Sequence, residues 1–105
     1  GEWSEHEVGM PVGPMAMSVV DMDGDGDPDV VVGEHNYEKP ATAKLIVFEN
    51  LDGKSAQWRR NVVHTGDEHH DGALAVDIDG DGDMDIVSIG WSHANVLVYE
   101  NRAIP

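Results

Sequence analysis

The stretch DMDGDGDPDVVV at residues 21–32 recurs as DIDGDGDMDIVS at residues 77–88, so the two copies start 56 residues apart. Flanking positions match as well, because Trp3 aligns with Trp58 and Val8 with Val63. The LIVFEN segment at residues 45–50 likewise matches VLVYEN at residues 96–101. The chain is therefore a single unit, residues 1–105, built of two repeats at about 1–55 and 56–105.

Each repeat predicts β structure, because its apolar runs are short, rich in Val and Ile, and bounded by Gly, Asn, Asp and Pro. The predicted strands lie at residues 5–10, 16–22, 29–34, 44–49, 59–64, 73–78, 85–90 and 96–100. Four antiparallel strands at a period near 50 residues are typical of a β-propeller blade. The expected fold is all-β, with two four-stranded antiparallel blades per chain; a two-sheet sandwich is the alternative.

Aspartates at alternate positions fill both copies of the repeated stretch, which we call the Asp loops. The first loop holds Asp21, Asp23, Asp25, Asp27 and Asp29, and the second holds Asp77, Asp79, Asp81, Asp83 and Asp85. Such carboxylates repel one another strongly unless a cation neutralises them. Oxygen ligands without Cys or His favour calcium, and Gly24 and Gly26 permit the positive φ angles of a tight loop. An acidic turn without an ion is the alternative.

An EF-hand loop begins in a similar way but needs a bidentate Glu at position 12, where this chain has Val32 and Ser88. Over nearly its whole length the chain instead resembles the FG-GAP/VCBS repeats of integrin α-subunit propellers, fungal propeller lectins and secreted bacterial proteins. The Phe-Gly dipeptide and the Gly-Ala-Pro tripeptide that name the family are absent.

The resemblance implies a ligand set for two calcium ions per chain, since DxDGDGxxD loops of that family use side chains at positions 1, 3, 5 and 9. The side-chain ligands would be Asp21, Asp23, Asp25 and Asp29 in the first loop and Asp77, Asp79, Asp81 and Asp85 in the second. Asp27 and Asp83 would offer backbone carbonyls. Extracellular calcium sites are weak, on the order of 0.1 to 1 mM, which favours a secreted or cell-surface location.

Two blades are too few for a closed propeller, which usually has four to eight. The resemblance implies that the Trp segment of each following repeat supplies the outermost strand of a blade. Residues 5–10 would then be an orphan outer strand, and the blade of residues 73–100 would lack one. Strand exchange between copies would close the ring as a trimer or tetramer. The alternative is an excised or designed piece of a longer propeller.

The connections opposite the Asp loops carry aromatic and polar side chains, which we call the rim. Its members are His35, Tyr37, His69, His70, Trp91 and His93. Rings that stack on a sugar beside groups that bind its hydroxyls predict glycan recognition. There are three alternatives. Trp91 could cover the next blade, His69-His70 could be a solvated turn, or a transition metal could bind at His69, His70 and His93. Trp3 and Trp58 are expected to pack on outer strands.

Composition narrows the class of protein. Against 21 Asp and Glu there are 6 Lys and Arg, a formal net charge of −15, which argues against nucleic acid as a partner. A hydrophobic content of 40% argues against a disordered acidic tail. Apolar runs such as Val30-Val31-Val32 are too short to cross a membrane, and there is no cysteine.

An enzyme is the competing class. His69, His70 and Tyr37 could act as general base or charge neutraliser, as in polysaccharide lyases built on propellers. Arg59, Arg60 and Arg102 are expected away from the rim, so an anionic sugar finds no clamp there. No Ser-His-Asp, phosphate-loop or cofactor motif is present. We therefore expect a binding protein and no enzyme, with a purely structural repeat as a further alternative.

Overall fold

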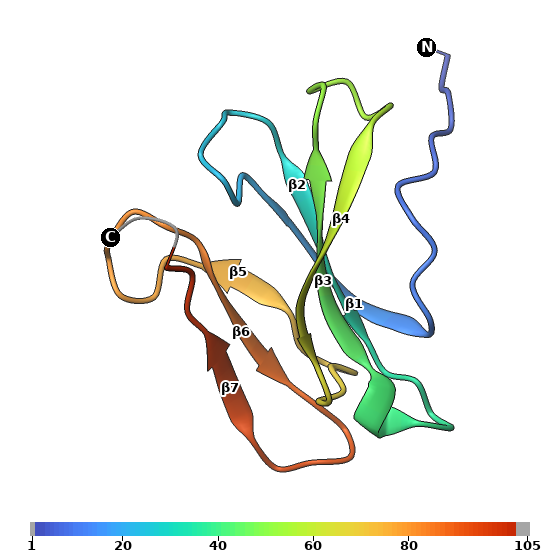
Figure 1. Cartoon of the computed structure of the whole chain (residues 1–105), viewed down its shortest axis with the longest axis vertical. Coiled ribbons are helices and arrows are strands. Elements are labelled where there is room, and N and C mark those ends of the chain that lie inside the picture. Colours follow the sequence, from blue (N-terminus) through green and yellow to red (C-terminus); the bar gives the residue numbers. More distant parts are fainter. Residues whose placement is uncertain (1, 103–105) are drawn as a thin grey trace.

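The computed structural model describes residues 2–102, which form two antiparallel sheets (Figure 1). The first sheet has the order β1-β2-β3-β4 and the second β5-β6-β7. The strands of the first sheet are β1 (Pro14–Val20), β2 (Asp29–Glu34), β3 (Lys44–Asn50) and β4 (Trp58–Thr65). Those of the second are β5 (Leu74–Val76), β6 (Asp85–Ile89) and β7 (Val96–Tyr99). The all-β prediction is confirmed.

The strand count differs between the two sheets. The prediction of four strands holds for the first sheet only, because the second has three within residues 2–102. The fourth strand of the first sheet is β4, which carries the Trp of the second repeat. Within residues 2–102, no equivalent strand pairs with β7.

The strand predicted at residues 5–10 does not form in the single chain, where residues 2–11 are without regular structure. This segment lies against the outside of the first sheet, where Val8 packs on Val32 and Phe48. Gly9 is so close to the Phe48 ring that any Cβ at this position would overlap it. The segment has no strand partner within residues 2–102, and the position beside β3 that a Trp segment takes is filled by β4.

Strand β2 is the most deeply buried, because both faces of the first sheet are covered along it. Val31, Leu45 and Ala16 face the second sheet and pack there against Ala73 and Ile86. On the opposite face, Val32, Ile46 and Phe48 form a second cluster with Trp58. The alternation of side chains along β2 therefore divides the core into two layers.

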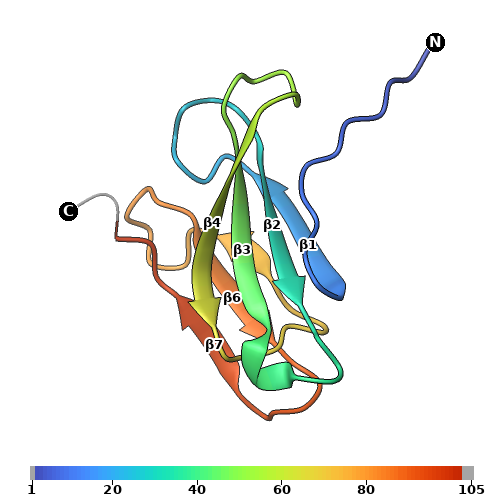
Figure 2. The same cartoon turned by 45° about the vertical axis from the view of Figure 1, so that its right-hand side comes forward.

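The connections separate into two ends, as antiparallel order requires (Figures 1 and 2). Residues 21–28, 51–57 and 77–84 lie at one end of their sheets. Residues 35–43, which include the short 3-10 helix η1 (Pro40–Thr42), lie at the other end with residues 66–73 and 90–95. Among residues 2–102 there is no helix with the length and apolar character needed to cross a membrane.

Candidate functional site

Both Asp loops fold around the carboxylate of their first aspartate. Asp21 accepts hydrogen bonds from the backbone N–H groups of Gly24 at 2.9 Å and Gly26 at 2.8 Å. Asp77 accepts the equivalent pair from Gly80 at 2.9 Å and Gly82 at 3.0 Å. All four glycines have φ between 74° and 97°, a conformation that other residues adopt only with strain. The sequence DGDG thus specifies the loop itself.

The ninth position of each loop is a buried carboxylate that ties the loop to its sheet. Asp29 accepts hydrogen bonds from the N–H groups of Met22 at 2.9 Å and Asn50 at 2.8 Å. Asp85 does the same with Ile78 at 3.1 Å and Asn101 at 2.8 Å. The donor from the end of each repeat is the backbone N–H of the Asn in the recurring Glu-Asn pair, so both repeats close on their loop in the same way.

Several carboxylates converge in each loop. In the second loop, one oxygen from each of four side chains lies within 4.8 Å of the others, and in the first loop three do so. The sets are Asp77, Asp79, Asp81 and Asp85, and Asp21, Asp23 and Asp29. Asp25 stands outside its set, unlike its counterpart Asp81. The carbonyl roles of Asp27 and Asp83 stay predictions.

The clusters fit a hard divalent cation, because oxygen atoms so close together repel unless a positive charge lies between them. Partial desolvation, together with a hydrogen bond to Glu49, raises the pKa of Asp23 to about 7. Desolvation and the neighbouring Asp81 also raise the pKa of Asp79. The Gly26 and Gly24 amides act in the other direction and lower the pKa of Asp21.

The surroundings of the two loops differ. Glu49 lies between Asp23 and Arg59 of β4, and these two partners lower its pKa. In the second sheet the matching residue is Glu100, which pairs with Arg102 at 3.6 Å instead. A Cβ at Gly53 would lie 2.6 Å from Asp27 Oδ1, so the connection of residues 51–57 also packs on the first loop.

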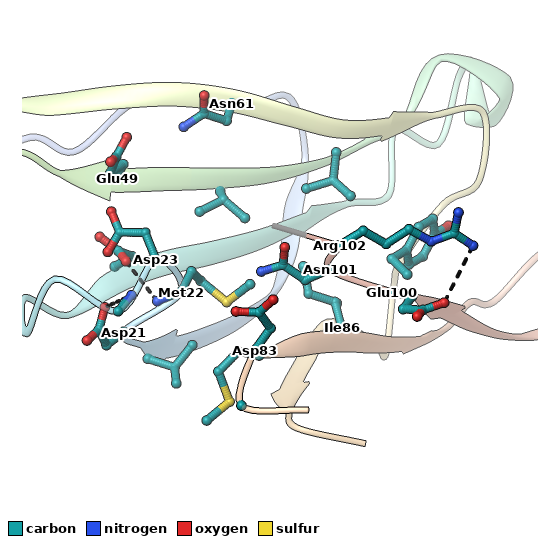
Figure 3. A pocket seen from close by; sticks show the side chains of 18 residues that line it. Asp21, Met22, Asp23, Glu49, Asn61, Asp83, Ile86, Glu100, Asn101 and Arg102 are labelled. Atoms are coloured by element: carbon teal, nitrogen blue, oxygen red, sulfur yellow. Dashed lines mark hydrogen bonds and ion pairs between the residues drawn. The ribbon is translucent and has the colours of Figure 1, made fainter. Parts of the chain in front are cut away.

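A cleft of about 950 Å³ opens between the sheets at the Asp-loop end (Figure 3). One wall carries Glu49 and Asn61 from β3 and β4, and the other carries Asp83 and Glu100 from the second sheet. Its inner surface is apolar and includes Ile86. The cleft therefore brings acidic side chains of both repeats to one opening.

The rim residues gather at the opposite end. The ring of His70 lies 4.8 Å from His35, 6.4 Å from Tyr37 and 5.4 Å from Trp91 between centroids. His35 also stacks on Tyr37 at 3.9 Å. Tyr37 and Trp91 are each 71% exposed, so two open rings flank a half-buried histidine. Their role in binding a ligand stays a prediction.

Three of the predicted rim histidines are structural in their contacts. His69 is fully buried, with Nδ1 hydrogen-bonded to Ser88 Oγ, and burial lowers its pKa. A Cβ at Gly33 would lie 2.5 Å from Cβ of His69, so Gly33 makes room for it. His35 is 3% exposed, and His93 Nε2 lies 3.0 Å from the Glu68 carbonyl oxygen.

The transition-metal alternative finds no support here. Across residues 2–102, the only groups of three or more close metal-ligating atoms are the two Asp clusters. The Nδ1 atom of His35 and the Nε2 atom of His69 are buried without a hydrogen-bond partner. The His69-His70 pair is not a solvated turn either, because His69 has 0% exposure.

A buried carboxylate that the sequence did not single out holds the rim together. Glu68, 1% exposed, accepts hydrogen bonds from the backbone N–H groups of His70, Trp91 and Ser92 and from the Ser92 hydroxyl. Desolvation acts to raise its pKa, but these donors outweigh it and lower the pKa to about 2. One glutamate between loops carries no pattern that sequence reasoning detects.

Glu34 plays the matching part in the first sheet. It is 2% exposed and accepts hydrogen bonds from the N–H groups of Val12 at 2.8 Å and Lys44 at 3.0 Å.

Of the two tryptophans expected on outer strands, Trp58 packs on the first sheet as expected. Trp3 is 97% exposed, and its segment pairs with no strand within residues 2–102.

Comparison with known proteins gives one match. A family model described as an FG-GAP-like repeat matches residues 21–88, from the first residue of the first Asp loop to Ser88 after the second. Neither a curated protein nor a solved structure matches the chain. The match spans both Asp loops, strands β2 to β5, and β6 as far as Ser88.

Proposed function

Because the chain belongs to the FG-GAP-like repeat family, we propose that it is a calcium-stabilised β-propeller module with one calcium site in each Asp loop. The observation that carries this proposal is the convergence of Asp77, Asp79, Asp81 and Asp85 within 4.8 Å. The first loop has the same hydrogen-bond frame around Asp21. Carboxylates so arranged match the oxygen ligands that calcium prefers.

A bound ion would neutralise the clustered charge and hold the ends of each strand pair together. Two calcium ions per chain would carry four positive charges against the formal net charge of −15. The ion binds the folded loop and not the unfolded chain, so a tenfold excess over Kd stabilises the fold by about 1.4 kcal/mol per site. Weak sites of this kind suit a secreted or cell-surface location, where calcium is abundant.

Titration calorimetry with calcium tests the proposal. We expect two sites per chain with Kd on the order of 0.1 to 1 mM, and a rise in Tm with added calcium. Asp77→Asn should remove one site and Asp21→Asn the other, while Asp52→Asn, an acidic loop residue outside both clusters, should leave both. The absence of heat and of any Tm shift up to 10 mM calcium would refute a calcium role.

We further propose that copies of the chain complete a propeller as a trimer or tetramer. The support is the difference in strand number, since the second sheet lacks the outer strand that β4 gives the first. Light scattering with calcium and with a chelator measures the mass. A discrete trimer or tetramer that dissociates on chelation is expected; a monomer in both conditions would overturn the ring and leave an excised propeller fragment as the better reading.

Recognition of neutral glycans at the rim is the second candidate function. It is supported by the exposed rings of Tyr37 and Trp91 on either side of His70. The Trp91 backbone is held by Glu68, so this ring starts from an anchored loop. A platform of two aromatic faces beside imidazole suits a sugar ring and its hydroxyls.

A glycan array checks this second candidate. Binding should be lost in Trp91→Ala and kept in Leu51→Ala, which removes an exposed apolar side chain at the opposite end of the first sheet. No hit at high protein concentration would remove the lectin hypothesis and favour a structural repeat without its own ligand. Cleavage of a polysaccharide would instead revive the enzyme class.

Binding without catalysis remains our proposal. Arg59 pairs with Glu49, and Arg102 pairs with Glu100 beside the cleft, both at the Asp-loop end. Neither guanidinium lies at the rim, where a lyase would need to neutralise a uronic acid. The net charge of −15 also disfavours anionic polysaccharides and nucleic acid.

A further inference from the structure

We infer that a second copy of this chain docks head to tail on the second sheet, and that the fold itself specifies the contacting faces and the strand register. The inference rests on the proposed ring and deepens it. One copy offers the far face of its second sheet and the edge of β7. The next copy offers the far face of its first sheet and its N-terminal residues 3–10.

The far face of the second sheet is an apolar surface. The cross-strand pairs Leu74–Val87–Val98 and Ile89–Val96 place these five side chains on one side. Leu74 is 63% exposed, Val96 71% and Val98 51%. A contiguous apolar sheet face of this kind is a site of interaction in a soluble protein.

The far face of the first sheet is apolar too. Met17 lies opposite Val32 and Val19 opposite Val30, so all four share the side that carries Phe48. Met17 is 69% and Val19 58% exposed, and the N-terminal segment covers only part of this face through Val8. Each chain therefore leaves one apolar face open at each end of its two-sheet stack.

The contact between the sheets inside one chain supplies the template for the contact between copies. There, Val31, Leu45 and Val47 of the first sheet pack against the second sheet. The repeat alignment makes these residues equivalent to Val87, Val96 and Val98 on the open far face.

The other half of the template matches equally well. Ile86 and Tyr99 form the second sheet's side of the contact inside the chain. Their equivalents in the first repeat are Val30 and Phe48, which lie on the far face of the first sheet, where the N-terminal segment covers Phe48 in the single chain. The two far faces therefore repeat the residue types of a contact that this chain already makes.

The edge of β7 follows the same logic. In the first sheet, β3 pairs with β4 so that Asn50 lies opposite Trp58 and Glu49 opposite Arg59. In the second repeat β7 is the counterpart of β3, and the counterpart of β4 is the Trp segment at residues 3–10. Transferring the register places Ser4 opposite Glu100 and Met10 opposite Asn95.

We assign the partner to another molecule of this chain. Figures 1 and 2 place the N-terminal segment and β7 on opposite sides of the first sheet, so one chain does not pair its own segment with its own edge. Within residues 2–102, β7 pairs with β6 alone. A foreign strand would lack the register that the Trp repeat provides.

Docking requires two changes in the single chain. Residues 8 and 9 must leave Phe48, which they cover here, and two chains of net charge −15 must approach. The register puts Ser4 beside Glu100 where the first sheet has the Arg59–Glu49 ion pair, so no ion pair helps. Assembly is therefore expected to depend on calcium and on salt.

Disulfide trapping tests the register, since the chain has no cysteine of its own. Single variants Ser4→Cys or Met10→Cys are mixed with Glu100→Cys or Asn95→Cys in calcium and oxidised. All four positions are exposed. We expect covalent dimers when Ser4→Cys is mixed with Glu100→Cys and when Met10→Cys is mixed with Asn95→Cys. The dimer yield of these two mixtures should be at least tenfold above that of the two crossed mixtures. Equal yields in all four mixtures, or the reverse preference, would overturn the inference.

A face variant separates this inference from the ring itself. Val98→Asp should convert the assembly to monomers, while Leu51→Asp, an equally exposed apolar site away from both faces, should not. Circular dichroism of each variant checks that the monomer is folded. A stable trimer or tetramer that survives Val98→Asp and shows no preferred cross-link would retain the ring and refute these contacts. A monomeric wild type would refute both.

Discussion

The two Asp loops are nearly identical in sequence and hydrogen bonding, yet they lie in different surroundings. In the first, three carboxylates converge and Asp23 is drawn toward Glu49, which Arg59 of β4 holds in place. In the second, four carboxylates converge and, within the described residues 2–102, no outer strand lies beside β7. A local motif therefore specifies the frame of the site, while the neighbouring strand decides how its charges are arranged.

The same contrast extends to the far ends of the sheets. A buried glutamate joins the connections in both, Glu34 in the first and Glu68 in the second. Glu34 accepts hydrogen bonds from two backbone N–H groups, whereas Glu68 accepts them from three backbone N–H groups and one hydroxyl. With fewer strands, the second sheet depends more on its polar connection.

The largest effect is expected from Glu68→Ala. Lowering of the Glu68 pKa from 4.5 to about 2 corresponds to about 3 kcal/mol of unfolding free energy at neutral pH. The variant also leaves buried backbone N–H groups without an acceptor. Urea unfolding of this variant and of Glu34→Ala measures the contrast between sheets. An equal loss in both would show that the second sheet has no special dependence on its glutamate.

The pH dependence of the same residue has a defined sign. Because the folded-state pKa of Glu68 is depressed, its contribution is present above about pH 4.5 and is lost as pH falls toward 2. The wild type should therefore lose stability between pH 5 and 3 more steeply than Glu68→Gln. Parallel curves for the two proteins would contradict this assignment.

Next in size are the buried ninth-position aspartates. Asp85→Asn leaves one of two backbone N–H groups without an acceptor and should cost about 2 kcal/mol of unfolding free energy. Asp29→Asn should cost the same, because its two contacts are equivalent. Thermal unfolding in chelator compares the two without calcium, and a twofold difference would show that the loop frames are not equivalent.

Calcium affinity sharpens the comparison between the loops. Asp81 belongs to its carboxylate cluster and Asp25 does not, so Asp81→Asn should weaken its site about tenfold and Asp25→Asn less. Calorimetry on each variant resolves the affected site. An equal loss in the two would mean that both loops close around the ion with four carboxylates.

The smallest effect concerns protons. The pKa of Asp23 is raised from 3.8 to about 7, so without calcium its contribution to stability is complete below about pH 4 and is lost as pH rises through 7. Calcium binding near pH 6.5 should therefore release a proton, detected as buffer-dependent heat. Glu49→Ala should reduce this release, whereas Glu100→Ala, the matched change in the second sheet, should not. A release unchanged by Glu49→Ala would remove Glu49 as a cause.

Much of the fold was accessible from the sequence. Strand positions followed from short Val-rich runs between turn residues, and the two ends of the molecule followed from antiparallel alternation. The loop frame followed from DGDG, because only glycine accepts those φ angles without strain. The Trp58 segment was expected as the outer strand of the first sheet, and β4 confirms it.

Other features were beyond sequence reasoning. The strand predicted at residues 5–10 was wrong for the single chain, because this segment packs on the face of the first sheet at Phe48 and pairs with no strand edge. The burial of His69 behind Gly33 and the role of Glu68 depend on contacts between segments. Neither leaves a periodic signal along the chain.

The sequence by itself determined the repeat, the β class and the pair of acidic loops, since backbone geometry and charge repulsion act over a few residues. Only the tertiary structure decided which carboxylates converge, which glutamates are buried and which faces stay open. These properties depend on distances between residues far apart in the chain: Glu49 meets Asp23, and Glu68 meets Trp91. Long-range packing sets desolvation, and desolvation sets how each charge behaves.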